Sequence, residues 1–349
     1  MVHGPEATQI RMMDYPGTGP ARDVWKVTND DTPALETGQV LVRIDWVSVD
    51  PGMSGWITNK RSYMPPVMPG GVMRAFGVGE VIESRANSLK QGEWVTGFLG
   101  LQSKAVFTAD NPAPFEELRK IPVDFAPPNL FLSGLGMTGY TAYFGMMDIG
   151  RPKPGETVVV SAASGAVGSV AAQLAKNSGA RVIGVAGGQE KCGYLIDELG
   201  LDGAIDYKAG DIRGQLKSLT PDRVDVYFDN VGGDILDELF LRMKYRGRIV
   251  VCGGISQYNS QSRGQGQIKG PSNYLTMVAQ SLTMRGFTMK DYMDRVPEAL
   301  PLLAKAWSEG QLKFREHVVE GIEKFPDTFE MLFDGRNHGK LLIKVQHAS

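Results

Sequence analysis

The segment AASGAVGS, residues 162–169, limits what this chain can fold into more than any other stretch of the sequence. Within it, Ala163, Gly165 and Gly168 have the spacing of a GxGxxG fingerprint, with Ala in place of the first Gly. Small residues are needed at such a turn because the backbone must bend tightly, approach a pyrophosphate and let a helix pack on a strand. The helix N-terminus then presents unpaired N–H groups to that anion.

This segment predicts a dinucleotide site, with a turn formed by Ala163, Ser164, Gly165, Ala166, Val167 and Gly168. The alternative is an ordinary tight turn between a strand and a helix. The surrounding sequence favours the dinucleotide site, because from Gly136 onward strand patterns alternate with helical patterns, which is typical of βαβ units and a parallel sheet. The strands are expected at 157–163, 181–186, 203–207, 223–233 (with its turn), 246–254 and 281–289, and the helices at 167–179 and 189–200.

The first 135 residues have a different pattern. Short strand-like runs such as 39–49 and 77–84 are separated by turns rich in Gly and Pro, which indicates a compact, barrel-like β domain. The segment 310–349 returns to strand-like text, so we expect it to rejoin this first domain. Residues 257–273 have no hydrophobic periodicity and are expected to form a long polar loop, and loops longer than about 15 residues are usually functional or disordered.

The end of the second strand of the parallel sheet bears on which dinucleotide binds. An NAD enzyme places a carboxylate there to bind the ribose, but this chain has Ala186, Gly187 and Gly188. Glu190 lies only in the following helix, and Lys191 is placed to pair with a 2′-phosphate as a point charge. The sequence therefore favours NADP over NAD, the alternative being that Lys191 is a solvated helix residue.

Composition and cysteine count exclude several other classes. The 37 basic and 39 acidic residues give a net charge of -2 without a basic stripe, which disfavours nucleic acid as a partner. The two cysteines cannot build a disulfide scaffold or a four-cysteine zinc site, and the four histidines lack metal-ligand spacing, so catalytic zinc is disfavoured. Without a secretory signal or an apolar run of membrane length, the chain is expected in the cytoplasm and away from membranes.

Several motifs resemble one enzyme family: AASGAVGS, GMTGYTAYFGMMDIG, YFDNVGG, CGGISQYN, MRGFTM and NHGKLLIKV. Together they resemble the zinc-free medium-chain dehydrogenases/reductases, in the branch of prostaglandin and leukotriene reductases, plant alkenal double-bond reductases and bacterial curcumin reductases. The resemblance implies an α/β fold, with a Rossmann doubly wound parallel sheet plus a GroES-like, mostly β catalytic domain. It implies a catalytic domain at 1–135, an NADP-binding domain at 136–310 and a return to the catalytic domain at 311–349.

The resemblance also implies an activity and site residues. Enzymes of this branch reduce the C=C bond of α,β-unsaturated ketones and aldehydes with NADPH and are commonly homodimers. Lys191 and Tyr207 match residues on the adenosine-phosphate side, and Tyr258 and Tyr63 match tyrosines at the substrate pocket. Further residues implied to line the cofactor are Asn230, Cys252, Gly253, Ile255, Phe287, Met289 and Asn337.

A hydride added to the β-carbon of an enone builds negative charge on the carbonyl oxygen, so the site needs a hydrogen-bond donor there. Tyr258 is our candidate for that donor and for the acid of the α-carbon, and packing alone is the alternative for it and for Tyr63. The family pattern DPYMR is replaced here by DPGMS, which leaves pocket shape open, and Asp50 within it is expected to be a turn or capping residue. A quinone reductase and an inactive NADPH-binding protein are the alternative functions.

Overall fold

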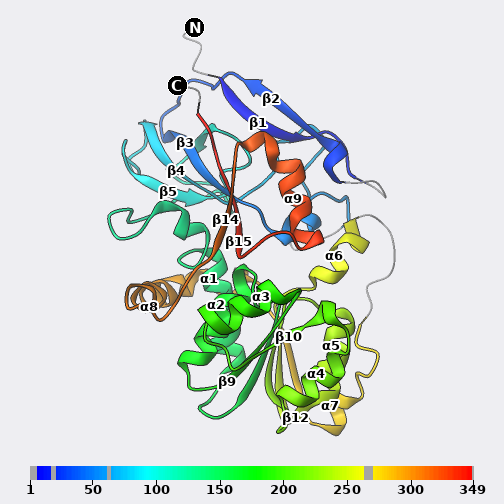
Figure 1. The fold of residues 1–349 in the computed structure, drawn as a ribbon. Coiled ribbons are helices and arrows are strands. Elements are labelled where there is room, and N and C mark those ends of the chain that lie inside the picture. Colours follow the sequence, from blue (N-terminus) through cyan, green and yellow to red (C-terminus); the bar gives the residue numbers. More distant parts are fainter. Residues whose placement is uncertain (1–5, 17–20, 61–63, 263–269, 348–349) are drawn as a thin grey trace.

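The computed structural model describes residues 6–16, 21–60, 64–262 and 270–347, which form two halves, one above the other in Figure 1. The lower half contains a six-stranded sheet in the order β10-β9-β8-β11-β12-β13, in which all neighbouring strands are parallel. Its strands are β8 (Thr157–Ser161), β9 (Arg181–Ala186), β10 (Gly203–Asp206), β11 (Val224–Asp229), β12 (Met243–Val251) and β13 (Thr283–Gly286).

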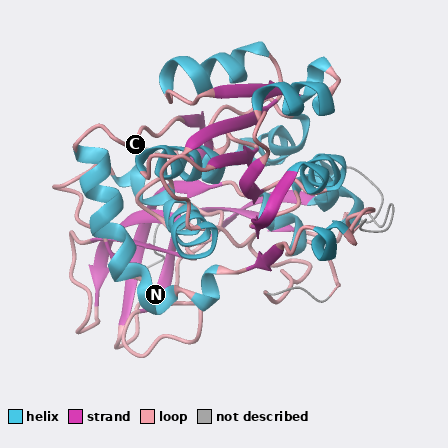
Figure 2. Ribbon diagram, turned by 90° about the horizontal axis from the view of Figure 1, so that it is seen from below, coloured by secondary structure: helices cyan, strands magenta, loops and turns pink. Residues whose placement is uncertain are grey.

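This sheet is doubly wound, because the chain leaves β8 towards β9 on one side and returns to β11 on the other. Helices flank the parallel strands in the view from below (Figure 2). They are α1 (Met137–Tyr143), α2 (Ala166–Asn177), α3 (Gln189–Gly193), α4 (Ile212–Leu219), α5 (Gly233–Arg242), α7 (Thr276–Ala279) and α8 (Val296–Ser308). The order of strands reverses beside β8, and in open α/β sheets ligands bind at the carboxyl ends of the strands at such a point.

The upper half is mostly β. A seven-stranded sheet runs β14-β15-β3-β4-β5-β7, with β6 also paired to β3, and β1 (Ala7–Met12) and β2 (Trp25–Asp30) form a separate antiparallel pair. The strands of the larger sheet are β3 (Gln39–Ser48), β4 (Gly77–Ser84), β5 (Trp94–Gly97), β6 (Lys104–Thr108), β7 (Arg119–Lys120), β14 (Glu316–Glu320) and β15 (Lys340–Lys344). Helix α9 (Phe325–Asp334) packs on this half through Phe325 and Phe329, which are buried.

The predicted fold class is confirmed, with a Rossmann-type parallel sheet and a mostly β part. The C-terminal strand β15 pairs with β3, so Leu342 lies opposite Ser48. The domain limits at 135 and 310 stay a prediction. Among the strands of the described residues, β8, β9 and β10 lie where the sequence indicates them, because apolar runs rich in β-branched residues mark buried parallel strands.

Three predicted elements were wrong in extent. The polar loop expected at 257–273 begins as a helix, α6 (Ile255–Ser262), which packs against a 3₁₀ turn, η2 (Pro51–Gly55), of the upper half. This tertiary contact stabilises a helix that has no amphipathic pattern of its own. The strand expected at 281–289 is confined to β13, and the strand-like text of 310–349 forms only the strands β14 and β15. Over the residues described, no helix combines the length and apolar character that crossing a membrane requires.

Candidate functional site

The glycine-rich turn lies between β8 and α2, at the point where the strand order reverses. Ala162 adopts a φ of 48°, a conformation that costs energy for a residue with a side chain, and such strain is concentrated at functional sites. A Cβ on Gly168 would lie 2.2 Å from the Ala162 carbonyl oxygen, so that only glycine fits there. Helix α2 has Gly165 at its N-cap and no acid in its first turn. The free amides of that turn therefore suit an anion.

The C-terminal segment lies against this turn. Gly165 and Gly339 form an isolated parallel bridge between the lower and upper halves. Gly339 has a φ of 72°, and a Cβ there would lie 2.0 Å from the Arg315 carbonyl oxygen. Asn337 donates from Nδ2 to the Gly339 carbonyl oxygen at 3.2 Å. The predicted residue Asn337 is thus beside the predicted turn, although about 170 residues separate them in the chain.

Two lysines and a tyrosine meet at the end of β9 and β10. Lys191 donates from Nζ to the Gly335 carbonyl oxygen at 2.7 Å. Burial, followed by the charge of Lys208, lowers the pKa of Lys191. Tyr207 lies against Gly187, where a Cβ would come within 2.7 Å of the phenol oxygen. Lys208, which the sequence did not single out, is a second ammonium group here, because its Nζ lies 3.8 Å from the position of a Cβ on Gly335.

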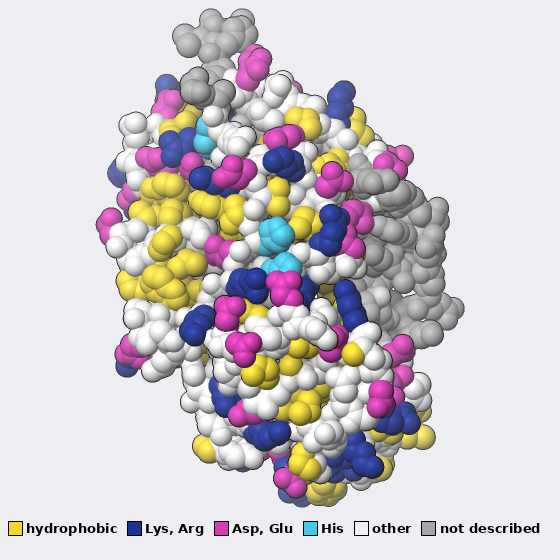
Figure 3. Space-filling view, viewed as in Figure 1, with side chains coloured by type: hydrophobic (Ala, Val, Ile, Leu, Met, Phe, Trp, Pro, Cys, Tyr) yellow, Lys and Arg dark blue, Asp and Glu magenta, His cyan; other side chains and the backbone are white. Residues whose placement is uncertain are grey.

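The acid in the first turn of α3 faces an arginine and a histidine. Glu190 lies 3.7 Å from Nη2 of Arg315 and 3.4 Å from Nδ1 of His338. Figure 3 shows histidine and charged side chains gathered where the two halves meet. The Glu190 side chain is 71% exposed, so these pairs contribute little to stability. Glu190 would by itself repel a phosphate bound near Lys191. The neighbouring Arg315 offsets that negative charge.

A buried carboxylate shapes the turn after β11. Asp229 accepts from the Tyr227 hydroxyl at 2.7 Å and from the amides of Val231 and Gly232 at 3.0 and 2.9 Å. Burial raises the pKa of Asp229 despite these donors. The neighbouring Asn230 donates from Nδ2 to the Ser161 carbonyl oxygen at 2.7 Å, which fixes its side chain at the end of β8.

The loop after β12 is tied to the same turn. The amides of Cys252 and Gly253 donate to the Asp229 carbonyl oxygen at 2.9 and 3.1 Å. The amide of Ile255 donates to the Asn230 carbonyl oxygen at 3.1 Å. The predicted residues Asn230, Cys252, Gly253 and Ile255 are therefore brought together. Burial raises the pKa of the Cys252 thiol to about 12, so it is not an activated thiolate.

Tyr258 lies on α6 and points back over this loop. The Gly254 amide donates to the phenol oxygen at 3.1 Å, and a Cβ on Gly253 would lie 3.0 Å from that oxygen. Burial raises the pKa of Tyr258, so the phenol keeps its proton at neutral pH. In Figure 1, α6 lies between the two halves, which brings Tyr258 to the carboxyl end of the parallel sheet.

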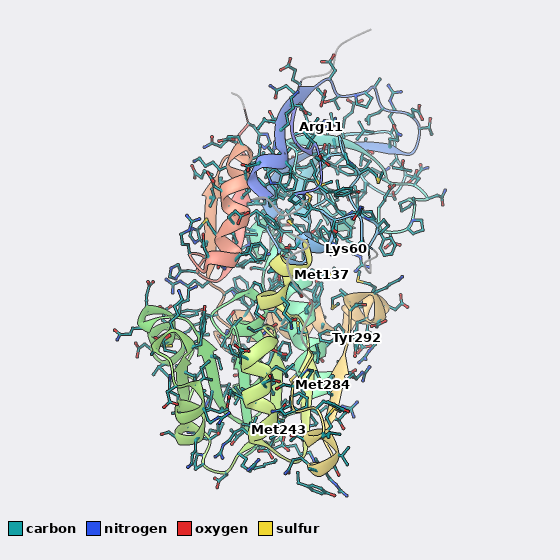
Figure 4. The ribbon with its side chains drawn as sticks, turned by 90° about the vertical axis from the view of Figure 1, so that its right-hand side faces the viewer. Arg11, Lys60, Met137, Met243, Met284 and Tyr292 are labelled. Carbon is teal, nitrogen blue, oxygen red and sulfur yellow. The ribbon has the colours of Figure 1, made fainter. Side chains whose placement is uncertain are left out.

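The remaining predicted residues are less closely grouped. Phe287 follows β13 rather than lying in it, and its ring meets Tyr292 edge-on at 5.9 Å between centroids. Met289 begins a 3₁₀ turn, η7 (Met289–Asp291), and packs against the core. Figure 4 labels Met137, at the start of α1, where the two halves meet. Tyr63 lies outside the described residues.

Asp50 does not cap a helix, which corrects part of the sequence interpretation. It stands at the N-cap of η2, but its carboxylate makes no capping hydrogen bond. Instead it accepts from Lys340 Nζ at 2.5 Å and from the Ser48 hydroxyl. The signal in the sequence is Lys340, which directly precedes the apolar run LLI in GKLLIKV. The sequence alone does not indicate that this lysine pairs with Asp50.

Two family descriptions match the chain. A family described as the N-terminal domain of oxidoreductase matches residues 8–114, and one described as zinc-binding dehydrogenase matches residues 166–305. Within the described ranges, no three His, Cys, Asp or Glu side chains come together as metal ligands would. Cys192 and Cys252, the softest donors, are separate free thiols. The residues present there do not fit a zinc site.

Similar proteins cover nearly the whole chain. The NADPH-dependent curcumin reductase of Escherichia coli is 37% identical over 95% of this chain and 94% of its own length. The NADP-dependent 2-alkenal reductase of Nicotiana tabacum is 37% identical over 88% of each chain. The structure of CurA from Vibrio vulnificus in complex with NADPH superposes with a TM-score of 0.90 at 35% identity, covering 98% of this chain and 100% of CurA. This chain therefore belongs to the medium-chain dehydrogenase/reductase family, in the branch that contains these reductases.

Proposed function

We propose that this NADP-dependent oxidoreductase reduces the C=C bond of α,β-unsaturated ketones and aldehydes. The observation that carries the proposal is the position of the Tyr258 phenol, held over the Gly253–Gly254 loop where open α/β sheets bind ligands. Burial raises the pKa of this phenol, which favours its protonated form. The names of the relatives support it, because a curcumin reductase and a 2-alkenal reductase are both similar over most of their length.

The residues present fit NADPH, which supplies a hydride when bound. The glycine at 168 and the free first turn of α2 suit a pyrophosphate, and Lys191 with Tyr207 suits a 2′-phosphate. The turn residues assigned to the cofactor are Ala163, Ser164, Gly165, Ala166, Val167 and Gly168. Residues assigned to its other half are Asn230, Cys252, Gly253, Ile255, Phe287, Met289 and Asn337.

The chain's own residues would handle the charge and the proton of the reaction. As the β-carbon is reduced, negative charge develops on the carbonyl oxygen, and the Tyr258 hydroxyl donates a hydrogen bond to it. The same phenol, directly or through one water, delivers a proton to the α-carbon. Because this donor is a phenol, the assigned steps need no metal ligand. Tyr63 is assigned to substrate contact on the family resemblance.

Steady-state kinetics with graded substrates test this function. An alkenal, a bulky dienone and a quinone are each offered with NADPH and, in parallel, with NADH. We expect the alkenal and the dienone to be reduced with NADPH, with loss of the C=C absorption and no alcohol product. Turnover of the quinone alone would replace the proposal with a quinone reductase. Tight NADPH binding without consumption of any substrate would make the chain an inactive binding protein.

We also propose that the enzyme is a homodimer, formed at the open edge of the six-stranded sheet. Strand β13 is the edge strand of that sheet, and an edge strand offers unpaired backbone groups to another chain. Large apolar side chains are exposed on α5, on β12, and in α7 and the two residues before it, namely Leu241, Tyr245, Tyr274, Leu275 and Val278. Exposed groups of this kind mark association surfaces.

A cytoplasmic location is proposed as well. Cys192 and Cys252 are both free thiols, which suits a reducing compartment. Fractionation of cells that express the tagged protein would test this, with recovery in a membrane or secreted fraction as the contrary result.

A further inference from the structure

Lys340 is a deeply buried charged side chain that the proposed reaction does not use. The residue is 2% exposed, and its Nζ lies 2.5 Å from Oδ1 of Asp50 and 2.5 Å from Oγ of Ser48. The Val49 carbonyl oxygen is a third neighbour of Nζ, at 3.4 Å. The Ser48 hydroxyl in turn donates to Oδ2 of Asp50. All three partners of the ammonium group lie at the end of β3, and this set of Lys340, Asp50 and Ser48 is called the β3–β15 polar cluster below.

The position of this cluster connects two parts of the site. Lys340 follows Gly339, whose backbone pairs with Gly165 of the glycine-rich turn. Consecutive Cα atoms are about 3.8 Å apart, so Lys340 begins within one residue of the segment that touches this turn. Asp50, at the other end of the ion pair, is the residue from which η2 begins. The cluster therefore joins the dinucleotide turn to η2.

The 3₁₀ turn η2 is in contact with the helix that carries Tyr258. Within η2, Met53 is fully buried in the upper core, and Asp50 directly precedes Pro51, the first residue of η2. Helix α6 packs against η2, and the phenol oxygen of Tyr258, on α6, lies 3.0 Å from the position of a Cβ on Gly253. A shift at the start of η2 would move the surface on which α6 rests. A misplacement of about 1 Å at a reacting group reduces rates by up to roughly a hundredfold.

The charges in the cluster are costly to bury, and stability alone does not explain them. A buried ion pair often contributes no more stability than a well-packed apolar pair of the same volume, whereas removal of one partner leaves an unpaired charge and is strongly destabilising. The Asp50 side chain remains 31% exposed, while that of Lys340 is 3% exposed. The pair thus fixes the orientation of a partly open carboxylate at the start of η2.

We infer that Lys340 and Asp50 are positioning residues, which hold η2 against α6 and thereby set the place of Tyr258 over the cofactor loop. This inference rests on the proposed function only for its effect on turnover. Its structural part concerns the order of η2 and α6 and is measurable without substrate.

The test compares Lys340→Met with the double variant Lys340→Met/Asp50→Leu, which removes both charges. The single variant is expected to lose thermal stability, because Asp50 is left without its partner. In the double variant the melting temperature should recover, since no unpaired charge remains. Its kcat for an enone should nevertheless stay roughly tenfold below that of the wild type, with the NADPH Kd within about twofold.

Hydrogen–deuterium exchange supplies a readout independent of activity. Deuterium uptake of peptides covering Pro51–Gly55 and Ile255–Ser262 should rise in the double variant and stay raised although its stability is restored. Lys244→Met/Asp225→Leu is the matched control, since this pair has a 2.8 Å contact in the lower half, away from η2. The control should leave uptake at η2 and α6 unchanged.

The outcomes separate the inference from the proposed function. If the double variant recovers both wild-type exchange and wild-type kcat, the cluster serves stability only and the inference is wrong. If the wild type reduces no enone but exchange at η2 and α6 rises as described, the positioning role holds and the proposed function fails. Unchanged exchange in the double variant would overturn the inference whatever the substrate.

Discussion

Among single residues, Tyr258 makes the sharpest prediction. Replacing it with Phe removes the hydroxyl while keeping the ring, so kcat for an enone should fall roughly tenfold or more. NADPH affinity, measured by fluorescence titration, should not change. Tyr245→Phe is the control, since Tyr245 is also a tyrosine but 62% exposed on the lower half. An unchanged kcat in the Tyr258 variant would remove its hydroxyl from the mechanism.

The raised pKa of Tyr258 also sets the direction of a pH profile. A pKa above the ordinary value of about 10 means that the acid form persists through neutral and mildly alkaline pH. The kcat should therefore stay level up to about pH 10 and fall only above it. A fall centred near neutral pH would assign the proton to another group.

If Lys191 and Lys208 bind the 2′-phosphate, replacing them should weaken the binding of NADPH and not that of NADH. Lys191→Met removes the more buried ammonium group, and the NADPH Kd should rise about tenfold or more, because hydrogen bonds to charged groups are strong. Lys208 is exposed, so Lys208→Met should raise the Kd only about threefold. The NADH Kd should stay the same in both variants, and titration calorimetry measures all four values. An equal rise for NADH would show that neither lysine reads the 2′-phosphate.

Residues of the site differed in how well the sequence predicted them. The glycine-rich turn was predictable, because few structures require small residues at that spacing between a strand and a helix. Lys208 was not, since its closeness to Lys191 depends on where the Gly335 loop folds back. Lys340 and Asp50 are 290 residues apart, and only the pairing of β15 with β3 brings them together.

At the scale of elements, the turn after β11 depends on Asp229. Asp229→Ala would leave the Tyr227 hydroxyl and the amides of Val231 and Gly232 without their acceptor. Unsatisfied buried groups are costly, so the free energy of unfolding should fall by about 3 kcal/mol in urea titration. Asp234→Ala, at an exposed position in α5, is the control and should change it by less than about 0.5 kcal/mol. Equal effects of the two variants would contradict the importance of this network.

Parallel strands were the elements most readily predicted, because their apolar β-branched runs are continuous. Helix α6 was missed, since its sequence ISQYNSQS has no apolar stripe and its stability comes from η2 and from the contact of Tyr258 with Gly254. The same reason applies to the shortened β13 and β14, whose ends are set by neighbouring strands rather than by propensity.

For the whole molecule, the proposed dimer predicts a mass. Light scattering after size exclusion should give about twice the chain mass of 38.0 kDa. Val278→Glu places a charge on the most exposed of the apolar side chains near β13, which is 78% exposed, and should shift the protein towards the monomer. Leu302→Glu on α8, 52% exposed, is the control that should leave the mass unchanged. A monomeric wild type would rule out the dimer.

The pairing of β15 with β3 has a consequence for synthesis. The parallel sheet is complete once β13 has left the ribosome, whereas β3 waits for its neighbour until nearly the whole chain has been translated. Domains generally fold as units during synthesis, so the lower half should become protease-resistant first, in nascent chains stalled at a length that lets α8 emerge from the ribosome. The upper half, although translated earlier, should resist cleavage only after β15 has emerged and paired with β3. Until then its open strand edge is the part of the newborn polypeptide most in need of a chaperone.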